Sequence, residues 1–232
     1  MHANERPSAD PMNKLVAEQG FAFVPGVLNK RECEELINLL GSANGAGRRG
    51  ILELPQIGRL ACSERLLSLL RPHLPAKAQP VRGIYFDKSP ETNWMVAWHQ
   101  DLTLAVRNRI DLPGFGPWSV KQGVPHVQPP VDLLEQMLTI RLHLDDSDEA
   151  NGALRVIPGS HQSGRLSADA IDRLQNENSP TVCCVAAGDA LLMKPLLLHS
   201  SARSHNESHR RVIHIEYAAF ALPGGLQWHE NP

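Results

Sequence analysis

The segment Asn93-Trp-Met-Val-Ala-Trp-His-Gln-Asp-Leu-Thr-Leu-Ala-Val106 places His99 and Asp101 one residue apart in an aromatic and aliphatic setting. Side chains alternate between the two faces of a β-strand, so a strand over Met95–Asp101 points both residues to the same side. An imidazole and a carboxylate suit Fe(II), Mn(II) or Zn(II), and a second, distant histidine would complete a facial triad. Such a pair also occurs by chance, so its meaning depends on the rest of the chain.

Most strand-like segments lie in the last two thirds of the chain, after two expected helices. Asn29–Gly41 predicts a helix with Asn29 and Glu32 as a capping box, and Ser63–Leu70 predicts a second helix capped by Ser63. A third, short helix is expected near Ser167–Gln175. Expected strands are Gly20–Pro25, Val81–Phe86, Met95–Asp101, Met137–Leu144, Ala153–Ile157, Thr181–Val185, Ala190–Lys194 and Arg211–Phe220.

This order of elements predicts a mostly β fold with flanking α-helices, a double-stranded β-helix (jelly-roll) barrel. We expect a disordered leader over residues 1–13 and a single domain over 14–232, with its core at about 81–220. The Gly- and Ala-rich segment Ser42–Gly50 is expected to be a flexible loop. Arg107–Pro130 holds six prolines and glycines within Leu112–Pro117 and Gly123–Pro125 alone. It is expected to be an irregular lid or binding loop, with Phe115, Trp118, Lys121 and His126 available to contact a ligand.

Composition excludes several classes of protein. Of the 232 residues, 42% are hydrophobic and 21% charged, as in ordinary globular proteins, and the net charge of −2 gives no basic field for nucleic acid. The N-terminus has no hydrophobic signal core, and no apolar run reaches the length of a membrane span. The cysteines, Cys33, Cys62, Cys183 and Cys184, form no Cys-x-x-Cys motif, so we expect a reducing, cytoplasmic setting.

His199 is the candidate for the distant histidine. It ends the apolar run Leu191–Leu198, where small polar residues follow, so a strand would orient it and a loop would leave a metal open to ligands. The alternative is a histidine that merely ends a strand at the surface. His143, inside an expected strand, is the main rival ligand, whereas His205 and His209 lie in a polar loop and are expected to be solvated.

Arg210 stands eleven residues after His199, at the start of another expected strand. A guanidinium that enters a sheet needs an anionic partner, because an unpaired buried charge is costly. A dicarboxylate that also chelates the metal would supply one. The alternative is that Arg210 and Arg211 form a solvated basic pair.

These residues together resemble the phytanoyl-CoA dioxygenase family of Fe(II)/2-oxoglutarate oxygenases. The resemblance spans about residues 81–217, and its specificity comes from the order of the motifs. They are Trp98-His-Gln-Asp101, then Asn151-Gly152 with Pro158-Gly-Ser-His161, then His199, Ser201 and Arg210.

The resemblance implies that His99, Asp101 and His199 hold Fe(II), and that Arg210 and Ser201 bind 2-oxoglutarate. Thr139 and Arg141 share a face of one expected strand, so both could line the co-substrate pocket or be ordinary residues of the sheet. Lys88, Asn93 and Trp94 could orient the pocket or shape its entrance. Asn151-Gly152 and Pro158–His161 are expected to form turns and to take no part in catalysis.

The implied activity is hydroxylation or desaturation of a small molecule with O₂, with release of succinate and CO₂. Because Asp101 fills the third ligand position, these reactions are favoured over halogenation. Candidate substrates are an organic acid, an amino-acid derivative or a natural-product intermediate, with no nucleic-acid or membrane partner. Two alternatives stay open: a cupin-like isomerase or hydrolase that uses the same triad with Zn or Mn, and a non-catalytic small-molecule binding barrel.

Overall fold

The computed structural model describes residues 11–43, 45, 47–75 and 77–232, and its largest element is a six-stranded antiparallel sheet. The strand order is β1-β11-β8-β13-β3-β2, and the central strand β13 pairs with β8 on one side and β3 on the other. The strands are β1 (Phe21–Val24), β2 (Arg48–Arg49), β3 (Gln79–Lys88), β8 (Met137–His143), β11 (Ala190–Met193) and β13 (Arg210–Ala218).

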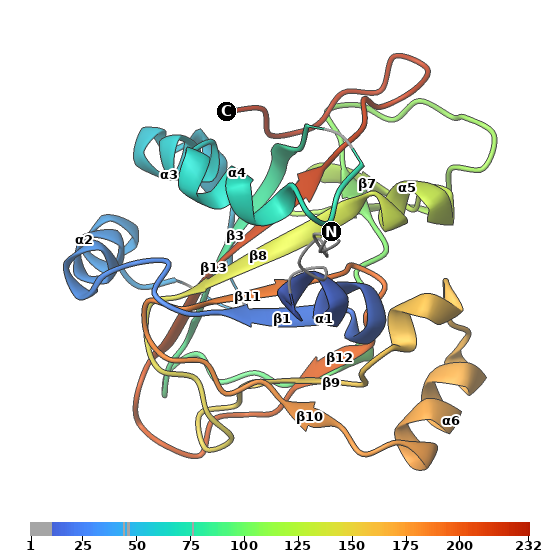
Figure 1. Cartoon of the computed structure of the whole chain (residues 1–232). Helices are drawn as coiled ribbons and strands as arrows, with labels where there is room; N and C mark the ends of the chain where they lie inside the picture. Colours follow the sequence, from blue (N-terminus) through green and yellow to red (C-terminus); the bar gives the residue numbers. More distant parts are fainter. Residues whose placement is uncertain (1–10, 44, 46, 76) are drawn as a thin grey trace, which may run out of the picture.

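A four-stranded antiparallel sheet, with the order β10-β9-β12-β4, forms a second layer. Figure 1 shows β9, β10 and β12 lying together on one side of β1 and β11. Phe21 and Met193 from the large sheet pack with Leu154 and Val156 from the small one, so apolar side chains hold the layers together. The predicted jelly roll is confirmed. The small sheet consists of β4 (Val96–His99), β9 (Leu154–Val156), β10 (Thr181–Val182) and β12 (His199–Ser201).

Helices cover the outer face of the large sheet. Along β13, Ile213, Ile215 and Tyr217 belong to the apolar cluster that includes the helices, whereas the intervening His214 and Glu216 face a cavity inside the fold. The flanking helices that the sequence predicts are therefore present. The helices are α1 (Pro11–Gln19), α2 (Lys30–Leu40), α3 (Pro55–Ala61), α4 (Glu64–Leu70), α5 (Val131–Glu135) and α6 (Ala168–Glu177), with 3₁₀ turns η1 (Ile51–Glu53) and η2 (Ser160–Ser163).

The predicted helix starts are confirmed. At α2 the Asn29 side chain accepts a hydrogen bond from the Glu32 N–H at 3.0 Å, and the Glu32 carboxylate accepts one from the Asn29 N–H at 2.9 Å. The capping box thereby satisfies two of the backbone N–H donors at the start of this helix. Ser63 and Ser167 cap α4 and α6 in the simpler way, through one side-chain oxygen each.

Two expectations about the first fifty residues need correction. The leader prediction falls mostly on residues 1–10, which lie outside the described residues, but residues 11–13 already belong to α1. Within the expected loop Ser42–Gly50, Arg48 and Arg49 form strand β2, which pairs with Tyr85 and Ile84 of β3. Two residues are too few to carry a strand pattern, so only the pairing with β3 reveals this edge.

The prolines and glycines of Arg107–Pro130 predict an irregular loop, but part of this segment forms regular strands. It contains β6 (Trp118–Lys121) and β7 (Val124–Val127), a hairpin that joins β5 (Leu104–Ala105) in a three-stranded sheet. Gln122 and Gly123 form its two-residue turn with φ values of 52° and 81°, the positive values that such tight hairpins require. The hairpin gives Lys121 a defined place beside the cavity.

Among the residues that the structure describes, no helix is long and apolar enough to cross a membrane. The four cysteines are free, with Cys33 and Cys183 buried and Cys62 and Cys184 exposed.

Candidate metal centre and co-substrate pocket

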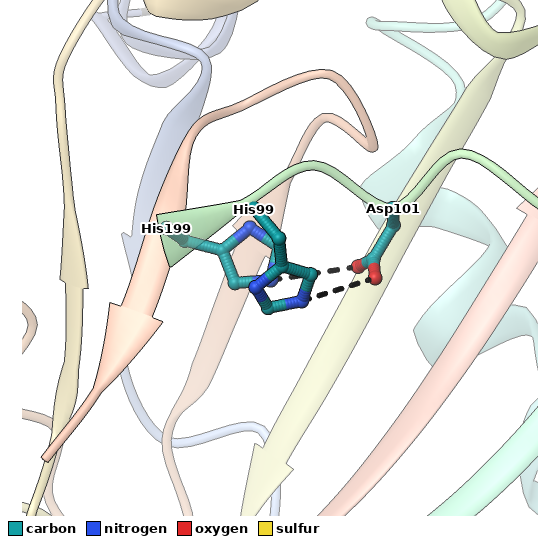
Figure 2. Close-up of side chains that lie close together, drawn as sticks. All are labelled: His99, Asp101 and His199. Atoms are coloured by element: carbon teal, nitrogen blue, oxygen red, sulfur yellow. Dashed lines mark ion pairs between the residues drawn. The ribbon is translucent and has the colours of Figure 1, made fainter. Parts of the chain in front are cut away.

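Two neighbouring strands of the small sheet bring the three predicted ligands together. Strands β4 and β12 are antiparallel, and their register sets His199 directly opposite His99. Asp101 follows two residues later, with one carboxylate oxygen 3.7 Å from His99 Nε2 and the other 3.7 Å from His199 Nε2. Figure 2 shows the three side chains converging, and their ligand atoms all lie within 4.8 Å of one another.

The same local contact orients both histidine rings. His99 Nδ1 lies 2.9 Å from the Ala97 carbonyl oxygen, and His199 Nδ1 lies 2.8 Å from the Leu197 carbonyl oxygen. A carbonyl oxygen can only accept, so each Nδ1 carries a proton, and in the neutral form of either ring the lone pair is on Nε2. The Nε2 atoms are the ones that lie near Asp101. A histidine with its proton on Nδ1 can bind a metal through Nε2.

Gln100 fixes the bend that returns Asp101 to the histidines. Strand β4 ends at His99, so the expectation of a strand through Asp101 is wrong. The side chain of Gln100 nevertheless turns away from the triad, as expected. Its amide nitrogen donates to the Leu196 and Gly164 carbonyls, and its oxygen accepts from the Leu166 N–H. The Asp101 N–H donates to the Pro195 carbonyl at 2.9 Å. Buried amide contacts therefore hold the aspartate where a regular strand would not.

The charge states of the triad suit a cation. Burial lowers the pKa of His199 to about 4, so its imidazole is neutral at neutral pH. Burial raises the pKa of Asp101, but His199, His214, His99 and Arg82 lower it more, so the carboxyl stays ionised. A neutral imidazole at His199 and an ionised carboxylate at Asp101 can bind metal without first losing a proton.

The triad opens into a cavity of about 450 Å³ between the two sheets. Arg210 lines this cavity from β13; the residue is 3% exposed, and its Nε and NH1 atoms have no hydrogen-bond partner. Burial and the nearby Arg141 lower its pKa to about 9. The alternative of a solvated basic pair with Arg211 is wrong, because Arg210 is buried and Arg211 points elsewhere and binds Asp145 through two 2.7 Å contacts. A buried, unsatisfied guanidinium is suited to an anionic ligand.

Ser201 and Lys88 flank Arg210. Lys88 lies opposite Arg210 in the pairing of β3 with β13 and is fully buried. Its ammonium donates to Ser201 Oγ at 2.9 Å and to the Ala202 carbonyl, and it lies 5.4 Å from the centre of the Trp94 ring. Ser201 in turn donates to the Gly152 carbonyl at 2.9 Å. Trp94 thus lines the pocket, and Lys88 supports Ser201 without lining it, whereas Asn93 bonds the backbone of Ser204.

The turn residues take the expected structural role. Asn151 exchanges hydrogen bonds with Asp148, side chain to backbone in both directions, and closes a turn. Gly152 follows with φ of +74°, and a Cβ there would lie 2.5 Å from the Ala202 carbonyl oxygen. Glycine is therefore required to bring this turn close to Ser201.

A chain of charged and polar groups inside the large sheet joins Arg141, which the sequence suggested, to Arg82, His214 and Glu216, which it did not. Arg141 NH1 lies 2.9 Å from His214 Nδ1, His214 Nε2 lies 3.4 Å from Glu216 Oε1, and Arg82 NH1 lies 2.9 Å from the same oxygen. All four are buried and line the cavity. The sequence signal was present in β13, where Arg210, His214 and Glu216 share one strand face with the apolar residues on the other.

The remaining candidates lie away from the triad. Thr139 is buried on β8 but does not line the cavity, so only Arg141 of that expected pair reaches it. His143 is buried, lies outside the metal cluster, and its pKa is lowered well below the usual value by burial and by Arg141 and Arg210. His205 is exposed as expected, but His209 is half-buried and contacts Asp87 at 2.7 Å.

We expect the stability of the ligand-free protein to depend on pH because Lys88 is buried. Burial, with Arg210 and Arg141 nearby, lowers its pKa to about 7, below the ~10.4 of an unfolded chain. Between these values the unfolded state binds more protons, so the free energy of unfolding should rise with pH by up to ~1.4 kcal/mol per unit above pH 7. Urea unfolding of the ligand-free protein at pH 7, 8 and 9 should show this rise, and Lys88→Met should reduce it.

Lys30→Met is the matched control for this series, since Lys30 is exposed at the start of α2. Its unfolding free energy should follow the pH dependence of the unsubstituted protein. Parallel curves for Lys88→Met and the unsubstituted protein would contradict the expected titration of Lys88.

Known proteins are similar to this chain in sequence and in fold. A curated relative from Stutzerimonas stutzeri, the probable alpha-ketoglutarate-dependent hypophosphite dioxygenase, is 25% identical over 177 residues. The match covers 70% of this chain, which spans about half (53%) of that relative's length.

Solved structures match most of the chain at low sequence identity. AviO1 from Streptomyces viridochromogenes Tue57 is 21% identical, with a TM-score of 0.64 over 92% of this chain and 96% of that one. HygX from Streptomyces hygroscopicus, solved with nickel and 2-oxoglutarate, is 19% identical, with a TM-score of 0.65 over 90% and 87%. EctD from S. alaskensis, solved with 2-oxoglutarate and 5-hydroxyectoine, is 16% identical, with a TM-score of 0.71 over 94% and 79%.

The family model for phytanoyl-CoA dioxygenase (PhyH) matches residues 16–212, which include the metal cluster, Ser201 and Arg210. The chain belongs to the phytanoyl-CoA dioxygenase (PhyH) family.

Proposed function

We propose that this chain is a non-haem Fe(II)- and 2-oxoglutarate-dependent dioxygenase that hydroxylates or desaturates a small molecule and releases succinate and CO₂. The observation that carries the proposal is one cavity that joins the His99–Asp101–His199 cluster to the unpaired guanidinium of Arg210. Two imidazoles and one carboxylate are the donor set of a facial triad. The guanidinium suits the second carboxylate of a dicarboxylate whose other end chelates the metal.

In this proposal each side chain has a defined task. His99, Asp101 and His199 hold Fe(II), and Arg210 binds the distal carboxylate of 2-oxoglutarate, with Ser201 beside it. Arg141 adds a second cation to the same wall of the cavity, and Thr139 supports that wall from β8. When bound, the iron and the co-substrate supply the oxidising chemistry with O₂, while the protein binds, orients and shields the reactants.

The activity of the curated relative and the ligands of the similar structures support this assignment. The curated relative is named as an alpha-ketoglutarate-dependent dioxygenase, and two of the similar structures hold 2-oxoglutarate. The elements that line the cavity run from β2 to β13, which supports a single catalytic domain over residues 14–232. A cavity of about 450 Å³ accommodates a small organic substrate beside the co-substrate.

Calorimetry under nitrogen, followed by exposure to air, tests the function. We expect the Fe(II)-loaded protein to bind 2-oxoglutarate, and glutarate to bind more weakly because it lacks the oxo group that chelates. Air should then release succinate from the 2-oxoglutarate complex, faster with a substrate present. Intact iron with neither co-substrate binding nor succinate would contradict the proposal. An isomerase or hydrolase on the same triad would instead be active without 2-oxoglutarate.

A further inference from the structure

The cavity carries more positive charge than a metal and its co-substrate require. Two carboxylates, Asp101 and Glu216, face five cationic side chains: Arg49, Arg82, Lys121, Arg141 and Arg210. A divalent metal and a dicarboxylate would cancel each other's charge, so the excess would remain after both had bound. A cavity lined by one sign of charge attracts a ligand of the other sign.

Arg49 and Lys121 are the cations without an assigned partner. Neither makes an ion pair within the described part of the chain, and Lys121 donates only to the Thr103 hydroxyl, at 3.2 Å. The Nε atom of Arg49 is buried and has no hydrogen-bond partner. The nearby carboxylate of Glu230 is already used, because its two oxygens accept the Leu52 and Gly83 N–H groups. An unpaired buried donor on a guanidinium is costly unless a ligand satisfies it.

These cations lie at the other end of the cavity from Arg210. Arg49 of β2 lies opposite Ile84 of β3, which lies opposite His214 of β13. His214 is four residues beyond Arg210, which corresponds to about 13 Å along a strand. A carboxylate bound at Arg210 is therefore too distant to neutralise Arg49.

Lys121 reaches the same end from the hairpin β6–β7. Burial lowers the pKa of its ammonium, and Arg82 and Arg49 lower it further, while Asp101 and Glu216 oppose the shift. The pKa of Arg49 is likewise lowered by burial and then by Arg82. Three cations that repel one another, next to a metal-ligand carboxylate, form a site that an anion would stabilise.

We propose that the primary substrate is a small molecule with an oxyanion group, which Arg49 and Lys121 bind while an adjacent C–H bond faces the His99–Asp101–His199 cluster. Arg82, held by Glu216, forms the floor of this site. The inference rests on the proposed function and names its substrate class. Carboxylate and phosphonate groups share the required chemistry, since a guanidinium binds the oxygens of either.

Anion binding to the protein loaded with Fe(II) and saturated with 2-oxoglutarate, under nitrogen, tests the site. The probes are methylphosphonate and acetate, with acetamide as the neutral counterpart of acetate. Calorimetry or thermal shift should detect at least one anion and no acetamide. Binding of methylphosphonate alone would assign a phosphorus oxyanion, and binding of acetate alone a carboxylate.

Arg49→Gln and Lys121→Gln should each weaken anion binding about 10-fold, as expected for the loss of a charge-assisted contact, and leave 2-oxoglutarate affinity unchanged. Arg48→Gln is the matched control: Arg48 is the neighbouring residue on β2 and does not line the metal cavity. Lys121 lies on an exposed hairpin, so its variant keeps the test valid if Arg49→Gln fails to fold.

Distinct results separate this proposal from the proposed function. An anion that displaces 2-oxoglutarate and binds a variant carrying both Arg49→Gln and Lys121→Gln with unchanged affinity would place the anion at Arg210 and overturn the site at Arg49 and Lys121. Absence of any anion binding while 2-oxoglutarate binds would also overturn it and leave the dioxygenase assignment intact. Failure of 2-oxoglutarate itself to bind would contradict the proposed function.

Discussion

Asp101→Ala should abolish succinate release and remove most of the bound Fe(II). Asp101 is the anionic member of the cluster, and its oxygens lie 3.7 Å from Nε2 of both histidines, so no other described carboxylate in the cavity can take its place. Glu216 also lines the cavity, but Arg82 holds it at 2.9 Å. The loss of Fe(II) affinity should exceed the ~100-fold loss that follows removal of a hydrogen-bond partner of a metal ligand, because Asp101 is itself a ligand.

Metal analysis after desalting, together with succinate release at saturating 2-oxoglutarate, measures the effect of Asp101→Ala. Asp111→Ala is the control, because Asp111 is exposed and pairs only with Arg109 on the surface. It should retain full iron content and activity. An Asp101→Ala protein that keeps both would show that the three-residue cluster is not the iron site.

Arg210→Met should produce two opposite effects, weaker co-substrate binding and an equally or more stable ligand-free protein. Removing one partner of a buried charge pair costs about 2–5 kcal/mol, so 2-oxoglutarate affinity should fall roughly 30-fold or more. In the ligand-free protein Arg210 is buried with two unpaired nitrogens, and its replacement by an apolar side chain removes that desolvation cost. Calorimetry and urea unfolding measure the two effects separately.

Arg211→Met should show the reverse pattern and serves as the matched control. Arg211 is the next residue on β13, points to the other face, and binds Asp145 through two hydrogen bonds of 2.7 Å. Loss of charge-assisted bonds at this partly buried site should lower the free energy of unfolding by about 1–3 kcal/mol. Its 2-oxoglutarate affinity should not change. If both arginine variants lost stability and kept co-substrate affinity, Arg210 would have only a structural role.

Local signals explain which elements could be predicted from the sequence. The capping box at Asn29 and Glu32 and the caps at Ser63 and Ser167 act within one helical turn, so neighbouring residues reveal them. The period of two in β8 and β13 is a property of one strand and is likewise visible in sequence. Prolines and glycines misled the interpretation of the hairpin β6–β7, because they also occur at the tight turns and ends of short strands.

The sequence by itself determined the parts whose cause is local: helix starts, strand faces, the pairing of imidazole and carboxylate at His99 and Asp101, and an arginine after a strand-ending histidine. The tertiary structure decided which distant residues share one cavity. Strand register sets His199 opposite His99, and Arg49 two strands away from His214. Register depends on the burial of whole sheet faces, which no short segment encodes, and it alone separates the two cationic ends of the site.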